Sequence, residues 1–303
     1  MPFNLKHGAS QKLGSSNLNG KRFKPGQLCN MSSLTTKAKI DSTPFHITTL
    51  FDWTCDAWLS FDVETHALAP NSGNGWEVGS FGHLRRICNL SDIEALQIVQ
   101  IGWTFGSFSS CDSPVTKSKI TKPVNAELSS AATAIHKVTK EMILSQGIEI
   151  ADALAEFLID LKHVIADKGR ICAHNLEFDA TIVHEAMVTA VMHEDDIHTF
   201  DIAAHYGFCT FDPCLTHWCC KEYLQSSKKF KDDYKLSEVP VGLAEIVRVL
   251  DQEVQDSLYP KHNAGVDSRA TWLVLQELHR LVRMDSANGK IGSDAPAKAS
   301  LRE

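Results

Sequence analysis

The chain contains 303 residues, of which 43% are hydrophobic and 22% are charged, and its formal net charge at pH 7 is −7. This composition is typical of an ordinary globular protein. No apolar run reaches the roughly 20 residues that a membrane-spanning helix needs, and no apolar segment follows the first charges as it does in a secretory signal.

The cysteines give a further expectation about the compartment. There are nine of them, an odd number without a regular framework, which favours reduced thiols over disulfides. We therefore expect an intracellular protein, in the cytoplasm or the nucleus, that contacts no membrane.

The charge is distributed unevenly. Residues 1–40 contain seven Lys or Arg and no acid, which leaves 23 basic and 37 acidic side chains from residue 41 onward, a balance of −14. Such a domain is no general polyanion binder, because non-specific affinity for nucleic acid comes mostly from Lys and Arg at phosphates. We expect residues 1–50 to be a basic, disordered leader. The lack of acids in residues 1–40 leaves organelle targeting open, although Arg22 is the single arginine there.

The first half of the chain favours strands. Residues 58–65 are expected to form the first strand, and residues 67–97 follow as a loop-like insertion rich in Pro, Asn and Gly turn signals. Two more strands are expected at 95–105 and 118–124.

Helices dominate from there on. A helical region interrupted in its middle is expected at 126–144, and a clear apolar stripe predicts a helix at 150–167. A short strand at 169–175 leads into a helix from 176. Two further helices are expected at 243–254 and 267–284, before a disordered tail at 285–303. This order indicates one α/β domain with a mixed sheet, at residues 51–284.

Two carboxylates stand near the end of the first expected strand, in the sequence WLSFDVETHAL (58–68). Strand side chains alternate between faces, so Asp62 and Glu64 point the same way, about 7 Å apart along the chain. Half-buried like charges repel each other, and protonation, a basic partner or a bound cation relieves the repulsion. A lone Asp-x-Glu more often belongs to a solvated strand face, so this pair alone leaves both interpretations open.

Two further acidic segments are equally ambiguous. In AHNLEFDATIV (173–183) Asp179 lies in the first turns of a helix, where Asn175 as N-cap and acids that complement the helix dipole are ordinary features. In KHNAGVDSRATWLVLQEL (261–278) Asp267 opens a helix after a loop that carries His262. A capping Asp and a surface His are ordinary there too.

Together, and in this order, the three segments resemble the histidine-bearing DEDDh branch of the DEDD-type 3′-to-5′ exonucleases. The motifs are Asp-x-Glu in 61–65, Ala-His-Asn followed by Phe-Asp in 173–179, and His-x4-Asp in 262–267. The resemblance covers roughly residues 56–284. The branch depends on His262, because the sister branch has a Tyr four residues before the final Asp, where this chain has Asn263.

The resemblance implies a ribonuclease-H-like fold, with a mixed five-stranded sheet flanked by helices, and a two-metal site. It implies that Asp62 bridges two Mg²⁺ or Mn²⁺ ions, that Glu64 and Asp267 hold the ion on the nucleophile side, and that Asp179 completes the cluster. Two such ions suit phosphodiester hydrolysis, and both prefer carboxylate oxygen. His262 is implied as the general base that takes the proton from the attacking water.

By the same resemblance, the substrate is the 3′ end of single-stranded RNA or DNA, and the products are nucleoside 5′-monophosphates. The residues implied in substrate binding are Thr65, His66, His174, Asn175 and Phe178. Some members of the family are dimers, so a homodimer is compatible with the sequence. The resemblance leaves the choice between RNA and DNA open. The alternatives are a non-catalytic nucleic-acid-binding module on the same fold and a zinc-dependent interaction protein.

The chain departs from the family in two insertions, 67–97 and 205–235, which we expect to flank the substrate entrance. The second contains SSKKFKDDYK, which fits either a contact to the nucleic-acid backbone or a solvated loop. It also contains a group of zinc-ligand residue types, Cys209, Cys214, His217, Cys219 and Cys220. Their spacing matches no usual zinc pattern, so buried free thiols are the favoured interpretation.

Overall fold

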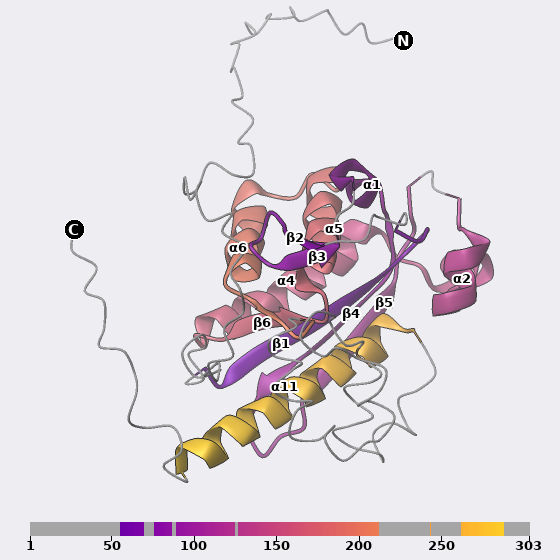
Figure 1. Ribbon diagram of the computed structural model, residues 1–303. Helices are drawn as coiled ribbons and strands as arrows, with labels where there is room; N and C mark the ends of the chain where they lie inside the picture. The colour runs from indigo at the N-terminus through magenta and orange to yellow at the C-terminus, as the bar shows by residue number, and fades with distance from the viewer. Residues whose placement is uncertain are drawn as a thin grey trace, which may run out of the picture. The chain divides into compact units, whose positions relative to one another are not determined.

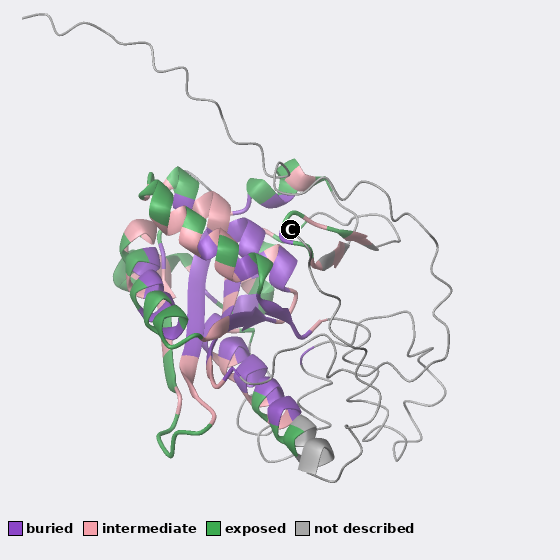
Figure 2. Ribbon diagram, turned by 90° about the vertical axis from the view of Figure 1, so that its left-hand side faces the viewer, coloured by how far each residue is buried: buried purple, intermediate pink, exposed green. Residues whose placement is uncertain are grey.

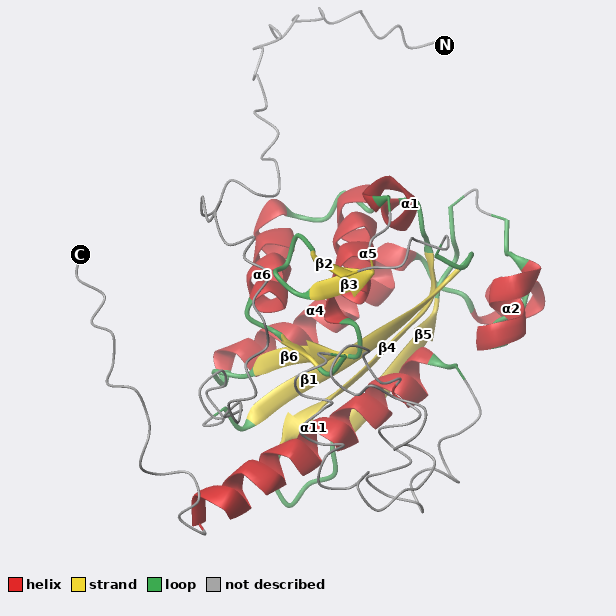
Figure 3. Ribbon diagram, in the orientation of Figure 1, coloured by secondary structure: helices red, strands yellow, loops and turns green. Residues whose placement is uncertain are grey.

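The structure is a computed structural model that describes residues 55–69, 76–86, 89–124, 127–211, 243 and 262–287. Its central sheet has the strand order β5-β4-β1-β6-β7, with β1 (Ala57–Thr65), β4 (Ile98–Ser107), β5 (Val115–Ile120), β6 (Arg170–Ala173) and β7 (Phe208–Cys209). β4 runs antiparallel to both β1 and β5, whereas β6 is parallel to β1 and β7. The expected mixed five-stranded sheet flanked by helices is confirmed (Figure 3).

Helices cover both faces of this sheet (Figure 1). α4, α5 and α6 pack on one face, and α11 lies along the other. The described helices are α1 (Leu90–Glu94), α2 (Ser130–His136), α3 (Lys140–Gln146), α4 (Ile150–Ala166), α5 (Leu176–Thr189), α6 (Glu194–His205) and α11 (Ala264–Ala287). None of them has the length and apolar character that crossing a membrane requires.

Because side chains alternate along β1, one face of this strand contacts the hydrophobic core and the other makes polar contacts with α11. Leu59, Phe61 and Val63 are buried in the apolar cluster on the side of α4 and α5. On the opposite side Ser60 is fully buried and donates a hydrogen bond to the carbonyl of Ser268 in α11, at 2.7 Å. The sheet therefore turns its apolar face to α4 and α5, and the carboxylates of β1 belong to the other face. Figure 2 shows how α11 presents a buried strip and an exposed strip.

Several expected boundaries differ from the observed ones. The third strand lies at 115–120 instead of 118–124, because it is a mostly exposed edge strand whose alternation begins at Val115 and whose lysines weaken the hydrophobic signal. α6 and β7 were not expected from the residues. Only two side chains of α6 are buried, and β7 has two residues, so neither leaves a clear periodic pattern. The interruption of the 126–144 region is confirmed, since Lys137 adopts a left-handed conformation (φ 61) between α2 and α3.

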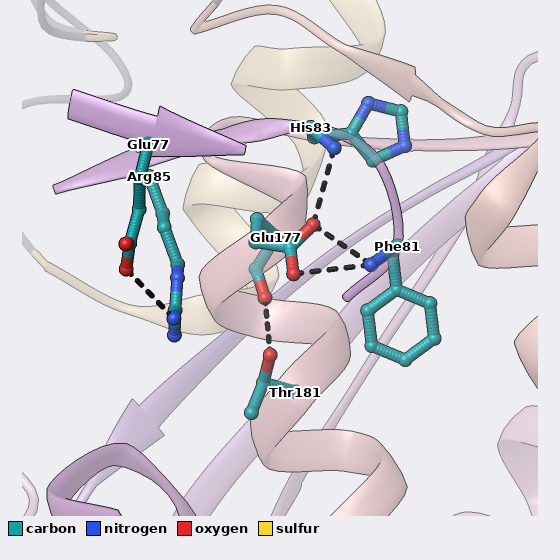
Figure 4. Close-up of polar contacts among 6 residues, drawn as sticks. All are labelled: Glu77, Phe81, His83, Arg85, Glu177 and Thr181. Atoms are coloured by element: carbon teal, nitrogen blue, oxygen red, sulfur yellow. Dashed lines mark hydrogen bonds and ion pairs between the residues drawn. The ribbon is translucent and has the colours of Figure 1, made fainter. Parts of the chain in front are cut away.

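The expectation of a loop-like insertion at 67–97 was wrong for much of the stretch from residue 76 onward. The short strands β2 (Trp76–Val78) and β3 (Leu84–Arg86) form an antiparallel hairpin, and α1 follows. What holds the hairpin is Glu177 of α5, whose fully buried carboxylate accepts hydrogen bonds from the amides of Phe81 and His83 at 3.1 to 3.2 Å (Figure 4). This contact spans about a third of the chain, so local sequence patterns do not reveal it.

Some of the sequence predictions fall outside the described residues. They are the leader at 1–50, the helix at 243–254 apart from Leu243, residues 212–235 of the second insertion, and the tail from 288 onward. α11 continues to Ala287, three residues beyond the end expected at 284.

Candidate metal centre and active site

β1 places two carboxylates at the end of the sheet where α11 begins. Asp62 lies opposite Gly102 of β4, and Glu64 lies opposite Gln100, so all four positions belong to the face that carries α11. Both carboxylate side chains are half-buried. They stand near the carboxyl end of β1, whose pairing with β6 stops at Ser60 and Cys172. The edge of β1 beyond that point is left open for another element.

The start of α5 fills that opening. The chain leaves β6 at Ala173 and turns at Asn175, which has a left-handed conformation (φ 81, ψ 49) and is the N-cap of α5. The expected cap is therefore present, although the Asn175 side chain makes no capping hydrogen bond. Asp179, in the first turn of the helix, is buried and accepts a hydrogen bond from the amide of Val63 at 3.3 Å. The third carboxylate thereby reaches the residue between Asp62 and Glu64.

α11 contributes the fourth carboxylate and the histidine. Asp267 lies in its first turn and is buried, whereas His262 precedes the helix and is exposed. Ligand atoms of Glu64, His262 and Asp267 all lie within 4.8 Å of one another. The structure thus brings together residues from the three sequence motifs, as we expected.

The carboxylates of this cluster raise one another's pKa values. Burial, followed by the charges of Asp179, Asp267 and Glu64, raises the pKa of Asp62 well above its usual range. Burial and the charge of Asp267 raise the pKa of Glu64 to about 8. Burial raises the pKa of Asp267 to about 7, although the backbone of Asn263 acts in the opposite sense. Burial is also the main cause of the raised pKa of Asp179.

Among the described residues, no Lys or Arg forms an ion pair with these four carboxylates. The buried Oδ1 of Asp267 has no hydrogen-bond partner among the same residues. A buried carboxylate oxygen without a donor is costly unless a cation or a proton neutralises it. The residues present therefore fit a site for hard divalent cations, which prefer such oxygen ligands.

The residues implied in substrate binding surround this cluster in different ways. Thr65 donates its hydroxyl to the carbonyl of Ala67, and Nδ1 of His66 accepts a hydrogen bond from the amide of Gln97. His174 is partly buried, and its desolvation lowers its pKa to about 3. Its Nδ1 lies 2.9 Å from the Thr210 hydroxyl, and its ring meets Phe211 edge to face.

Asn175 and Phe178 are the remaining two residues implied in substrate binding. The buried Oδ1 of Asn175 has no hydrogen-bond partner among the described residues, and Phe178 is partly buried against the core. Substrate binding by all five residues stays a prediction.

Two residues near the cluster were not singled out from the sequence. His136, at the end of α2, is buried, and its Nδ1 accepts a hydrogen bond from the amide of Val138 at 3.0 Å. Burial lowers its pKa, the backbone of Thr65 raises it, and repulsion from His262 lowers it further. Gln100 is buried beside Glu64. Neither position stands out by residue type, because a helical His and a strand Gln are common.

The cysteines of the second insertion are described in part. Cys209 is buried in β7 and its Sγ accepts a hydrogen bond from the amide of Leu176 at 3.4 Å, an arrangement expected of a buried free thiol. The other zinc-ligand residue types of that group, between residues 214 and 220, lie outside the described residues.

Comparison with known proteins gives structural similarities only. No protein-family model matches the chain, and no curated protein matches it. A moderately thermophilic exonuclease I from Methylocaldum szegediense is 15% identical, with a TM-score of 0.48, over 77% of this chain and 41% of that chain. E. coli exonuclease I in complex with a dT13 oligonucleotide is 12% identical, with a TM-score of 0.49, over 76% and 43% of the two chains. Cell-death related nuclease 4 (CRN-4) is 13% identical, with a TM-score of 0.42, over 76% and 64%.

These three proteins are nucleases by name, the class to which the sequence motifs point. The matched region covers less than half of each of the two exonuclease I chains. Similarities at such identities and TM-scores carry no argument about activity, so the proposals below rest on the residues of this chain.

Proposed function

We propose that this protein is a two-metal 3′-to-5′ exonuclease that acts on the ends of single-stranded RNA or DNA and releases nucleoside 5′-monophosphates. The observation that carries the proposal is the convergence of Asp62, Glu64, Asp179 and Asp267 at one end of β1, with His262 within 4.8 Å of two of them. They come from three elements that are far apart in the sequence. Mere binding of nucleic acid does not require this set.

Each residue has a task that its position supports. Asp62 and Glu64 extend from the same face of β1, and ligand atoms of Glu64 and Asp267 lie within 4.8 Å of each other, so these carboxylates would hold the divalent ions together with Asp179. Two Mg²⁺ or Mn²⁺ ions held there would offset the phosphate charge and stabilise the leaving oxygen. His262 is exposed at the edge of the cluster, where it can take the proton from an attacking water. The same arrangement lets an acidic domain accept a polyanion.

Digestion of end-labelled strands tests the proposal. Single-stranded RNA and DNA labelled at the 5′ or the 3′ end are incubated with Mg²⁺ and sampled over time. We expect 5′-labelled strands to shorten stepwise, and 3′-labelled strands to release labelled mononucleotide at once. A 3′-phosphate should slow the reaction, because a 3′-hydroxyl end has to enter the site.

Circular single strands provide the decisive control. Cleavage of circles at the rate of linear strands would show an endonuclease. Tight binding of every strand without cleavage would instead favour the non-catalytic nucleic-acid-binding module.

A further inference from the structure

The start of α11 is fixed to the sheet by one buried side chain that has no part in the proposed chemistry. Gln100 of β4 is only 4% exposed, and its Oε1 accepts a hydrogen bond from the amide of Ala264 at 3.2 Å. Its Nε2 donates to the hydroxyl of Ser118 on β5 at 3.1 Å. The amide of Gln100 therefore connects the first residue of α11 to two neighbouring strands.

The remaining donors in this first turn are satisfied by the helix's own cap. Oδ1 of Asn263 accepts hydrogen bonds from the amides of Gly265 and Val266, and the Asn263 carbonyl accepts one from Asp267 at 2.8 Å. A helix leaves its first four amides without internal partners. The bonds to Asn263 lie within the segment that starts the helix, so they do not fix its position on the sheet. The bond from Ala264 to Gln100 is different, because it fixes where the helix stands on the sheet.

The packing beneath the helix is equally close. A Cβ added to Gly102 would lie 2.2 Å from the backbone of Ala264 and Gly265, so only glycine allows this approach. One turn further along, the carbonyl of Ser268 accepts the hydroxyl of Ser60, and the Ser268 hydroxyl lies 3.2 Å from that of Thr104. The interface is thus polar and directional, and polar contacts specify register more narrowly than apolar packing does.

We propose that Gln100 is a positioning residue that sets His262 and Asp267 opposite Asp62 and Glu64. Ala264 lies two residues after His262 and three before Asp267, so a shift of the helix start moves both groups together. The inference rests on the proposed nuclease function for its kinetic consequence. A misplacement of about 1 Å in an active site can reduce turnover by about 100-fold.

The test replaces Gln100 with methionine, which has a similar length but neither hydrogen bond. With saturating metal we expect kcat on a 5′-labelled oligonucleotide to fall by about 10- to 100-fold, with KM within about twofold because the bound strand is held elsewhere. Mn²⁺ affinity, measured by calorimetry without substrate, should fall by about 10-fold, as for residues that orient metal ligands. In the metal-free protein, NMR should show faster hydrogen exchange at the Ala264 amide than at Gly265 and Val266.

Two further variants separate positioning from general damage. Thr121→Val removes a different buried hydrogen-bonding group, a hydroxyl that donates to the carbonyl of Ile98 on β4, and it should leave kcat, Mn²⁺ affinity and Ala264 exchange unchanged. Ser118→Ala keeps the bond from Ala264 to Gln100 but removes the partner of Nε2, and it should cause a smaller loss in the same direction. If Gln100→Met does not fold, the effect of Ser118→Ala on kcat, Mn²⁺ affinity and Ala264 exchange tests the proposal instead.

The proposal is overturned if Gln100→Met lowers thermal stability while kcat, Mn²⁺ affinity and Ala264 exchange stay as in the wild type. It is also overturned if Thr121→Val causes the same kinetic loss. Should the wild-type protein prove inactive on nucleic acid, the proposed function fails. Metal affinity and amide exchange would then still decide whether Gln100 positions the start of α11.

Discussion

At the scale of single residues, Asp62 is a carboxylate whose charged form is disfavoured by its surroundings in the folded protein. Burial and three neighbouring carboxylates all disfavour its charged form. Asp160 provides a contrast inside the same protein, because its buried carboxylate accepts hydrogen bonds from Trp103 and Lys117, both at 2.7 Å. Trp103 and Lys117 compensate the charge of Asp160, whereas a bound cation would compensate the charge of Asp62. The same substitution should therefore have opposite effects at the two positions.

We expect Asp62→Asn to stabilise the metal-free protein at pH 8. At this pH the unfolded chain carries Asp62 charged, whereas the fold disfavours the charged form. The neutral amide removes this cost, so the unfolding midpoint should rise by about 2–4 °C, the shift that 1 kcal/mol produces in a domain of roughly this size. Differential scanning calorimetry in EDTA measures it. Asp160→Asn should lower the midpoint, because it weakens two satisfied bonds. A decrease for both variants would contradict this account of the cluster.

His262→Ala tests the assignment of the general base. We expect turnover to fall by roughly 10²- to 10⁴-fold, with Mn²⁺ and substrate still bound. Turnover of both proteins is measured at saturating Mg²⁺. His163→Ala, which changes another exposed histidine on α4, is the matched control. Near wild-type turnover in His262→Ala would remove this residue from the mechanism.

At the scale of elements, the β2–β3 hairpin and α5 depend on each other. Glu177 lies two residues before Asp179, and its carboxylate accepts hydrogen bonds from the turn of the hairpin (Figure 4). Phe81 of the same turn packs edge to face with His184 and Phe200. The inserted segment thus supports the helix that carries one of the candidate metal ligands.

Gly79→Ala should disrupt this docking from the hairpin side. The new Cβ would lie 2.0 Å from Oε1 of Glu177, so we expect a loss of about 1–3 kcal/mol in the free energy of unfolding, measured by urea denaturation. Ser80→Ala, at an exposed neighbour, should stay within about 0.5 kcal/mol of the wild type. In a Glu177→Ala background the Gly79→Ala penalty should largely vanish. Equal penalties in both backgrounds would show that the two residues do not interact.

The elements also show what the sequence could reveal. The apolar stripe of α4 and the apolar runs of β1 and β4 could be recognised in the sequence, and the motifs in β1, α5 and α11 identified the carboxylates that the structure brings together. The hairpin was missed because its stability comes from Glu177, about a hundred residues away. Gln100 was missed for a related reason, since a buried amide acquires its role only when Ala264 is placed against it. Local sequence patterns indicate buried positions and helix caps, but they do not indicate which hydrogen-bond donor contacts an acceptor that is distant in the sequence.

At the scale of the whole molecule, the cluster couples stability to pH and to metal. The folded state raises the pKa of Glu64 to about 8 and that of Asp267 to about 7, so it binds more protons than the unfolded chain between about pH 4 and pH 8. The stability linked to these protons is present at low pH and is lost as the pH rises through 7 and 8. Metal ions reverse the effect, because they bind the deprotonated carboxylates.

We therefore expect the metal-free protein to unfold at a lower temperature at pH 8 than at pH 5. The hydrogen bond to Asp201 raises the pKa of His184, which contributes a change of the same sign. The lowered pKa values of His174 and His136 contribute changes of the opposite sign, so the rise in midpoint caused by the metal is the more specific quantity. The rise in midpoint on adding Mn²⁺ should be larger at pH 8 than at pH 5, and Asp267→Asn should reduce this difference. If Mn²⁺ raised the unfolding midpoint by the same amount at pH 5 and pH 8, this linkage between proton binding and metal binding would be contradicted.

The central claim is that the four carboxylates and a divalent cation together hydrolyse the phosphodiester bond. The measurement that tests it most directly is the rate at which a 5′-labelled single strand shortens in Mg²⁺, in Mn²⁺ and in EDTA, for the wild type and for Asp62→Asn. We predict rapid shortening by the wild type with either metal and none in EDTA. Asp62→Asn, correctly folded by circular dichroism, should be slower by orders of magnitude with both metals. Undiminished shortening in EDTA after exhaustive dialysis, or by Asp62→Asn, would contradict the two-metal account.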